Sequence, residues 1–280
     1  MKKVLVPTDF SDQAGNALRV ANKIAHKSGC EVILMTVIEP TKAITGSKDM
    51  SNIEDSIEQK YVKYLVENAE GRMQKLVNEI EFANTNCTTR VEIGNIYKAI
   101  TDMAMKENID MIIMGTQGAS GLDEILIGSN TEKIVRNAVC PVLTVRNTPE
   151  DFTGDNIVFA TNLKEEQIPS IDKLQGFQKL FDAHIHLLYV ITPASFNTTR
   201  EINQLKDNFV EKAGLDNYTF HVYSEANEES GILHFTEDFG ADIIAVATHQ
   251  RKGWRHFFSG SIAENIVNHS KKPVLAFNMK

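Results

Sequence analysis

The chain repeats itself, and this repeat limits the possible folds more than any other feature of the sequence. Residues 110–116 (DMIIMGT) return as residues 242–248 (DIIAVAT), an offset of 132 residues. Two further landmarks keep the same offset: Gly128-Ser129 with Gly260-Ser261, and residues 141–143 with residues 273–275. Three landmarks in one register without a gap indicate a duplicated domain.

The beginnings of the two copies also match, at a different offset. Residues 3–9 correspond to residues 156–162, which gives an offset of 153 residues. The fall from 153 to 132 places 21 extra residues in the first copy, and the polar segment 41–59 is the expected insertion, a loop leading into a helix. A polar stretch containing Pro149 and Gly154 separates the copies. The expected domains are therefore residues 1–147 and 154–280.

Composition excludes several classes of function. The net charge of −8 argues against a broad DNA-binding surface, which needs a basic face. No apolar run is long enough to cross a membrane. The three cysteines show no metal-binding spacing and are expected to be small buried residues, which fits a cytoplasmic protein. His184 and His186 share one face of a strand, but no further metal ligands lie at a suitable spacing, so hydrogen-bonded or solvated histidines are expected.

Short apolar runs alternate with amphipathic segments in each copy. This order, βαβαβαβαβ, predicts the α/β class, with a parallel sheet covered by helices on both faces. In the first copy the expected strands are residues 4–6, 31–37, 89–93, 111–114 and 141–145. The expected helices are residues 14–25, 57–82, 97–108 and 131–138.

Ligands of such sheets bind beyond the carboxyl ends of the strands, where the strand order reverses. Three segments are expected there: Pro7-Thr8-Asp9 after the first strand, residues 37–39 after the second, and residues 115–118 after the fourth. The polar and glycine-rich character of these segments makes this edge of the first copy the candidate site.

A glycine-rich loop joins the fourth strand of the first copy to its last helix. It contains Gly115, Gly118 and Gly128-Ser129, with no lysine or arginine between them. Glycine permits close approach of the main chain, and the N-terminus of the following helix favours phosphate oxygens. Ser129 or Asn130 is expected to cap that helix. The negative charge of a bound phosphate must then be balanced by N–H groups, the Ser129 and Thr131 hydroxyls, and a divalent cation. The alternative is that the glycines only make turns.

Other nucleotide loops are absent. The sequence contains no G-x-x-x-x-G-K-[ST] motif, which excludes a P-loop NTPase. It also lacks a G-x-G-x-x-G motif after the first strand, which argues against a dinucleotide site.

The spacing Gly115-x2-Gly118-x9-Gly128-Ser129 resembles the G-2x-G-9x-G-[S/T] signature of the universal stress protein family. Residues 7–11 resemble the opening segment of that family, and residues 141–145 its closing strand. The resemblance implies two tandem doubly wound, Rossmann-like domains, each with a five-stranded parallel sheet. It also implies that residues 142–145 pair with residues 274–277, which gives an intramolecular pseudo-dimer. Whether the chain pairs again as a homodimer stays open.

The same resemblance implies that the first copy binds ATP, and Mg²⁺ is the expected divalent cation. Asp9 would contact the adenine, Pro7 and Thr8 would shape the wall beside it, and Val37 would offer main-chain groups to the base. The remaining residues follow the ribose and phosphates: Met114, Gly115 and Gly118 along the path, then Gly128, Ser129 and Asn130 at the phosphates. Asp9 has an alternative role as the cap of a helix starting near Ser11 or Asp12.

The second copy departs from this pattern. Asn162, Ala160, Ala247 and Gln250 replace Asp9, Pro7, Gly115 and Gly118, and the loop 248–258 is basic and aromatic. Little or no ATP binding is expected there. The loop could hold another anion at Gly260-Ser261, reach across to the first domain or a partner chain, or pack as a decayed site.

The leading hypothesis is therefore a nucleotide-dependent stress-response regulator. A slow ATPase or adenylyl-transfer enzyme is one alternative, although only Asp123 and Glu124 suggest themselves for catalysis. A scaffold that binds partners independently of ATP is the other.

Overall fold

A computed structural model describes residues 1–39, 57–80, 82, 85–116, 127–147, 152–249 and 262–279. Predictions about Gly118, the basic loop with Gln250, and Gly260-Ser261 concern residues outside this part of the chain. The predictions about Asp123 and Glu124 do so as well.

In the described part of domain one (residues 1–147), nine elements follow one another in the expected order. They are β1 (Lys3–Pro7), α1 (Asp12–Ser28), β2 (Glu31–Ile38), α2 (Ile57–Glu79), β3 (Cys87–Ile93), α3 (Ile96–Lys106), β4 (Met111–Gly115), α4 (Ser129–Asn137) and β5 (Val142–Val145). Each expected strand and helix is present, and most of the bounds differ by one to three residues from those read in the sequence.

Domain two repeats this order, with one short addition. Its elements are β6 (Asn156–Ala160), a 3₁₀ turn η1 (Glu165–Gln167), α5 (Ile168–Phe181), β7 (His184–Ile191), α6 (Thr199–Ala213), β8 (Tyr218–Ser224), α7 (Glu228–Phe239), β9 (Ile243–His249), α8 (Ile262–His269) and β10 (Val274–Met279). The 3₁₀ turn stands where α1 begins in domain one.

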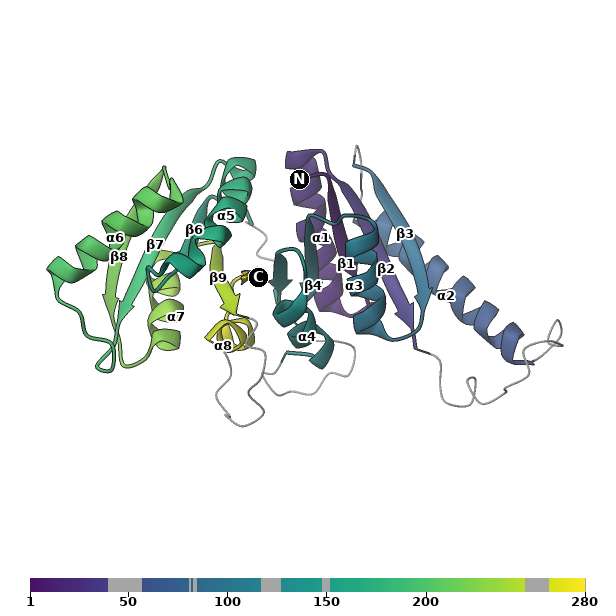
Figure 1. Ribbon diagram of the computed structural model, residues 1–280. Helices are drawn as coiled ribbons and strands as arrows, with labels where there is room; N and C mark the ends of the chain where they lie inside the picture. Colours follow the sequence, from purple (N-terminus) through teal and green to yellow (C-terminus); the bar gives the residue numbers. More distant parts are fainter. Residues whose placement is uncertain are drawn as a thin grey trace.

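The described strands form one sheet in the order β3-β2-β1-β4-β5-β10-β9-β6-β7-β8 (Figure 1). Pairing is parallel within each domain. The two halves join where β10 runs antiparallel to β5, with Leu275 opposite Leu143. The fold is thus two tandem α/β domains with five parallel strands each, as the sequence predicted. Strand order reverses between β1 and β4, and again between β6 and β9.

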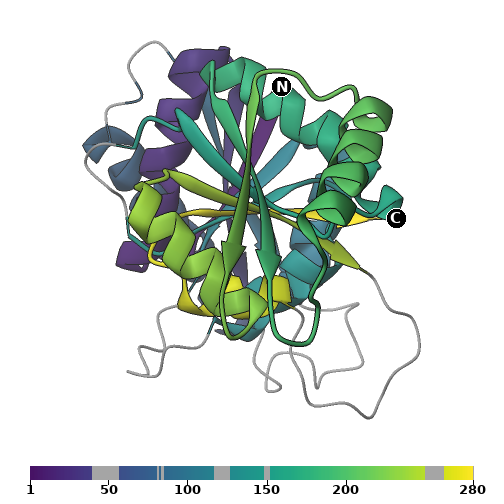
Figure 2. The same ribbon diagram turned by 90° about the vertical axis from the view of Figure 1, so that its left-hand side faces the viewer.

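Helices cover both faces of the sheet, as the view along it shows (Figure 2). Alternate strand residues point to opposite faces, so Val4 and Val6 join one core while Leu5 joins the other. One core is packed by α1, α2, α5 and α6, and the other by α3, α4, α7 and α8. Both cores contain residues of both domains. None of the described helices is both long and apolar enough to cross a membrane.

The aspartate that opens the first repeated landmark has a structural role. Asp110 accepts a hydrogen bond from the main-chain N–H of Lys3 at 2.9 Å, and Asp242 accepts one from Asn156 at 3.0 Å. Both bonds fix the start of the central strand of their domain. They lie at the amino ends of the strands, away from the edge where a ligand is expected.

Candidate functional site

The carboxyl ends of β1 and β4 lie side by side, because these strands pair in parallel with Leu5 opposite Ile112. The main chain of Thr8 continues the β1 ladder by donating to the Met35 carbonyl on β2 at 2.8 Å. The structure therefore gathers the ends of β1, β2 and β4 at one edge. These ends carry six of the predicted site residues: Pro7, Thr8, Asp9, Val37, Met114 and Gly115.

The turn after β1 has a fixed and strained shape. The buried Thr8 hydroxyl accepts from the Phe10 N–H at 3.0 Å, and an Asp9 carboxylate oxygen accepts from the Ser11 N–H at 3.0 Å. These bonds hold Phe10 at φ +65°, a left-handed conformation that costs a residue with a side chain about 1 kcal/mol or more. The turn leaves the Asp9 side chain exposed at the edge.

Ser11, rather than Asp9, caps α1. Its hydroxyl accepts from the Ala14 N–H at 3.2 Å. The alternative role of Asp9 as the helix cap is therefore wrong, since its side chain instead closes the preceding turn.

A cation from α2 covers this turn. The Arg72 guanidinium carbon lies 3.9 Å from the centre of the Phe10 ring, a cation–π distance. Sequence reasoning missed this residue because α2 contacts the turn only in the folded chain. Arg72 adds positive charge to an edge whose glycine loop has none.

Gly115 has a packing role that the sequence did not reveal. A Cβ at this position would lie 2.9 Å from the main-chain carbon of Gln13 and 3.1 Å from the main-chain nitrogen of Ala14. The first turn of α1 therefore rests directly on the end of β4. The adjacent Thr116 hydroxyl donates to the Gln13 side chain at 3.0 Å and ties the two elements together.

The N-terminus of α4 differs from the expected capping. Gly128 is the N-cap residue, with no side-chain cap hydrogen bond, and Ser129 is the first helical residue. The prediction that Ser129 or Asn130 caps the helix is thus wrong. Gly128 takes this position because its N–H donates to the Thr116 carbonyl at 2.8 Å. The Thr131 hydroxyl also has another use, since it is buried and donates to the Gly115 carbonyl at 3.1 Å.

This arrangement suits an anion. The first N–H groups of a helix have no partner within it, and the helix dipole places partial positive charge there. No side chain of the described residues caps α4, so its first turn can offer these groups to a ligand. Ser129 is exposed and Asn130 is partly exposed at the same end. A phosphate is the natural ligand of such an end.

The matching edge of domain two keeps the shape of the turn but changes its chemistry. Leu163 has φ +60°, and its N–H donates to the Thr161 hydroxyl at 2.9 Å. The side-chain oxygen of Asn162 accepts from the Lys164 N–H at 3.1 Å, as Asp9 does in domain one. However, the Gln167 side chain accepts from the Thr161 hydroxyl at 2.6 Å and from the Asn162 N–H at 3.2 Å. The Thr161 hydroxyl and the Asn162 N–H at this edge are therefore hydrogen-bonded within the protein.

The end of β7 is also more buried than the end of β2, to which the resemblance assigns contact with the base. Val190 is buried, whereas its counterpart Val37 is only partly buried. A Cβ on Gly231 of α7 would lie 2.5 Å from a Val190 methyl carbon. The helix thus packs directly on the Val190 side chain, and the counterpart of Gly231 in α3 is Ala99.

The sequence model of the universal stress protein family matches residues 1–146 and again residues 154–278. The chain belongs to the universal stress protein family. Universal stress protein Slr1230 of Synechocystis is 25% identical over 99% of this chain and 100% of that protein. Universal stress protein MJ0577 of Methanocaldococcus jannaschii is 31% identical over 52% of this chain and 94% of that protein. The crystal structure of a universal stress protein from Archaeoglobus fulgidus has a TM-score of 0.77 at 20% identity, covering 99% of this chain and 98% of that one.

His184 and the three cysteines lie at or next to the amino ends of strands, away from the site edge. His184 contacts Asn217 at 3.0 Å and Thr219 at 2.8 Å, so the expectation of a hydrogen-bonded histidine is confirmed. Cys30 and Cys140 are buried as expected, whereas Cys87 is only partly buried. Burial raises the pKa of both Cys87 and Cys140 to about 11.

Proposed function

We propose that this universal stress protein binds one ATP, at the carboxyl edge of β1 and β4 in domain one. One observation carries the proposal: the N-terminus of α4, without a side-chain cap, lies at the end of β4, where the strand order reverses. Residues 1–147 then form the nucleotide-binding domain. Residues 154–280 form a domain in which Gln167 hydrogen-bonds the turn after β6 and α7 packs on Val190.

The family resemblance assigns the residue roles within this proposal. Asp9 contacts the adenine beside Pro7 and Thr8, and Val37 offers main-chain groups to the base. The phosphates lie against the N-terminus of α4, whose residues are Gly128, Ser129 and Asn130. No three His, Cys, Asp or Glu side chains in the described residues are grouped to hold a metal ion. Mg²⁺ would enter with the phosphates, as it commonly does in nucleotide sites.

Nucleotide binding would regulate partner proteins during stress by biasing the conformation of the chain. The domains share two cores, so a change at one edge reaches the other domain through packed residues. The proposal requires binding and not hydrolysis.

Domain two supplies the variant that tests the site. Asp9→Asn should preserve the turn, because Asn162 accepts the equivalent hydrogen bond at 3.1 Å. It removes the carboxylate charge and replaces one acceptor oxygen by an NH2 donor. A hydrogen bond to a charged group contributes about 1.5 kcal/mol or more, so the dissociation constant for ATP should rise about tenfold.

Calorimetry with MgATP measures both affinity and stoichiometry, and Asn162→Asp is the matched control. One site per chain, weakened by Asp9→Asn and unchanged by Asn162→Asp, supports the proposal. Two equal sites, or an affinity that Asp9→Asn leaves unchanged, would contradict it. Steady phosphate release by the same samples would instead favour the slow ATPase.

A further inference from the structure

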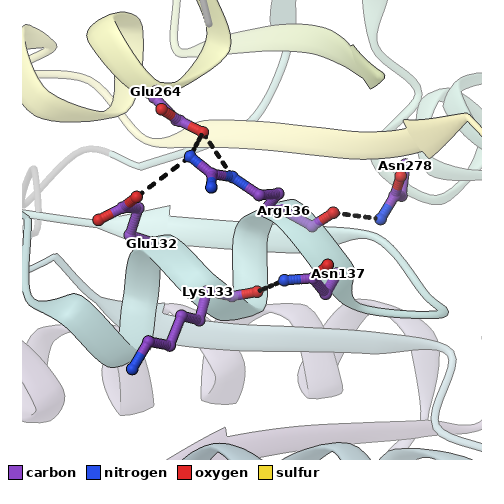
Figure 3. Close-up of polar contacts among 6 residues, drawn as sticks. All are labelled: Glu132, Lys133, Arg136, Asn137, Glu264 and Asn278. Atoms are coloured by element: carbon purple, nitrogen blue, oxygen red, sulfur yellow. Dashed lines mark hydrogen bonds and ion pairs between the residues drawn. The ribbon is translucent and has the colours of Figure 1, made fainter. Parts of the chain in front are cut away.

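Side chains of domain two form hydrogen bonds with α4, the helix that the proposed function places at the phosphates, and with the residue just before it. Figure 3 shows two of these contacts, near the C-terminal end of α4. The Arg136 guanidinium Nε donates to Glu264 of α8 at 2.9 Å. The Asn278 amide on β10 donates to the carbonyls of Arg136 at 2.8 Å and Ala138 at 3.2 Å. Asn278 is only 7% exposed, so its two bonds are made in the interior of the domain contact.

A third contact reaches the opposite end of the helix. The Ile127 main-chain N–H donates to the Asn268 side-chain oxygen of α8 at 2.9 Å. Ile127 directly precedes Gly128, the N-cap of α4. Asn268 is itself fixed, because its main-chain carbonyl accepts from Arg146 at 2.8 Å. Side chains of domain two therefore contact α4 near its C-terminus and at the residue just before its N-cap.

The repeat shows that this contact belongs to the pairing of unlike domains. Asn268 occupies in domain two the position that Arg136 occupies in domain one, at the offset of 132 residues. An arginine side chain has no acceptor oxygen to offer an N–H group. A second copy of domain one could therefore not supply the bond that Asn268 makes to Ile127.

We propose that Asn268 is a positioning residue for the nucleotide site of domain one, so that domain two completes a site it does not itself contain. The bond to Ile127 fixes the chain just before the N-terminus of α4, where the phosphates would bind. Precise placement of hydrogen-bond donors raises affinity because less ordering remains to be done on binding. This inference rests on the proposed function. Since coupling between binding and a conformational contact is reciprocal, ATP should in turn protect the Ile127–Asn268 bond.

Asn268→Ala removes the acceptor, and Asn265→Ala is the matched control. Asn265 lies on the same helix, but its amide donates to Glu229 within domain two at 2.9 Å. Two measurements are made on the full chain: amide hydrogen exchange at Ile127 without nucleotide, and the dissociation constant for MgATP. Asn268→Ala should speed the exchange at Ile127 and weaken ATP binding, each by about fivefold, since a hydrogen bond contributes about 1 kcal/mol. Asn265→Ala should change neither by more than about twofold.

The two measurements separate the possible failures. Unchanged exchange at Ile127 in Asn268→Ala would overturn the positioning contact. Faster exchange with an unchanged ATP affinity would show that the Ile127–Asn268 contact does not position the nucleotide site, and would overturn that part of the proposal. If the wild-type chain bound no ATP, the proposed function and the link would both fall, while the exchange result would still decide the contact. A thermal unfolding midpoint near that of the wild type shows that the variant has folded.

Discussion

Gly115→Ala should destabilise domain one by about 2 kcal/mol, even without a ligand. The added methyl carbon would lie 2.9 Å from the main-chain carbon of Gln13 and 3.1 Å from the nitrogen of Ala14. Carbon atoms pack best at about 3.5–4.0 Å, so the first turn of α1 must move by roughly half an ångström. It cannot move freely, because the Ser11 cap and the Thr116–Gln13 bond hold it. Overpacking of this kind costs about 1–3 kcal/mol.

Gly71→Ala is the matched control for this prediction. Gly71 lies within α2, and a Cβ there meets no other atom within 4 Å. Alanine is favoured over glycine in a helix by about 1 kcal/mol, so this variant should be slightly more stable than the wild type. Urea unfolding followed by circular dichroism measures both changes, which should have opposite signs.

One result would refute the packing role of Gly115. If Gly115→Ala were as stable as the wild type to within about 0.5 kcal/mol, the approach of α1 to β4 would not require glycine. Loss of ATP binding at unchanged stability would then return Gly115 to the ligand-lining role suggested by the sequence.

Three further predictions follow from burial and charge. Burial, together with neighbouring histidines, lowers the pKa of His186 from 6.5 to about 4, which favours its neutral form in the folded chain. The stability that His186 contributes is complete above pH 6.5 and is lost as the pH falls towards 4. The loss should amount to about 2 kcal/mol. His186→Gln should therefore flatten the pH dependence of the thermal midpoint in this range. Arg136→Met should cost about 1 kcal/mol or less, because the Arg136 side chain is 52% exposed, and a double-mutant cycle with Glu264→Gln should show coupling that shrinks in high salt. Cys87 and Cys140, whose pKa burial raises to about 11, should react with iodoacetamide at pH 8 only slowly until urea unfolds the chain.

The order of the elements could be predicted from the sequence because it depends on local periodicity. The buried face of α1 was visible as alanines and aliphatic residues at helical spacing, and the helix ends at Gly29 in the left-handed conformation that glycine readily adopts. The strands could be predicted equally well, since parallel strands buried on both faces are continuous apolar runs. These features need no knowledge of distant contacts.

The errors at the site have a different origin. Capping preference favours Ser129 or Asn130 over Gly128, but the bond from the Gly128 N–H to the Thr116 carbonyl decides where α4 begins. The glycine pattern likewise cannot tell whether Gly115 leaves room for a ligand or for another helix. Contacts such as those of Arg72 with Phe10 join segments far apart in the chain, so no local pattern reports them.

The two domains make equivalent main-chain contacts with different side chains. Arg146 donates to the main-chain carbonyl of Asn268 at 2.8 Å, and its counterpart Asn278 donates to that of Arg136 at 2.8 Å. The same bond thus crosses the domain contact in both directions, made by different side chains. The β1 and β6 turns behave alike, because Phe10 and Leu163 share one strained conformation around different neighbours. Where the main-chain geometry is shared, as in the turns after β1 and β6, a difference in ligand binding is expected to come from side chains at matched positions. Exchange of single residues between those positions is therefore the most direct way to move the site from one domain to the other.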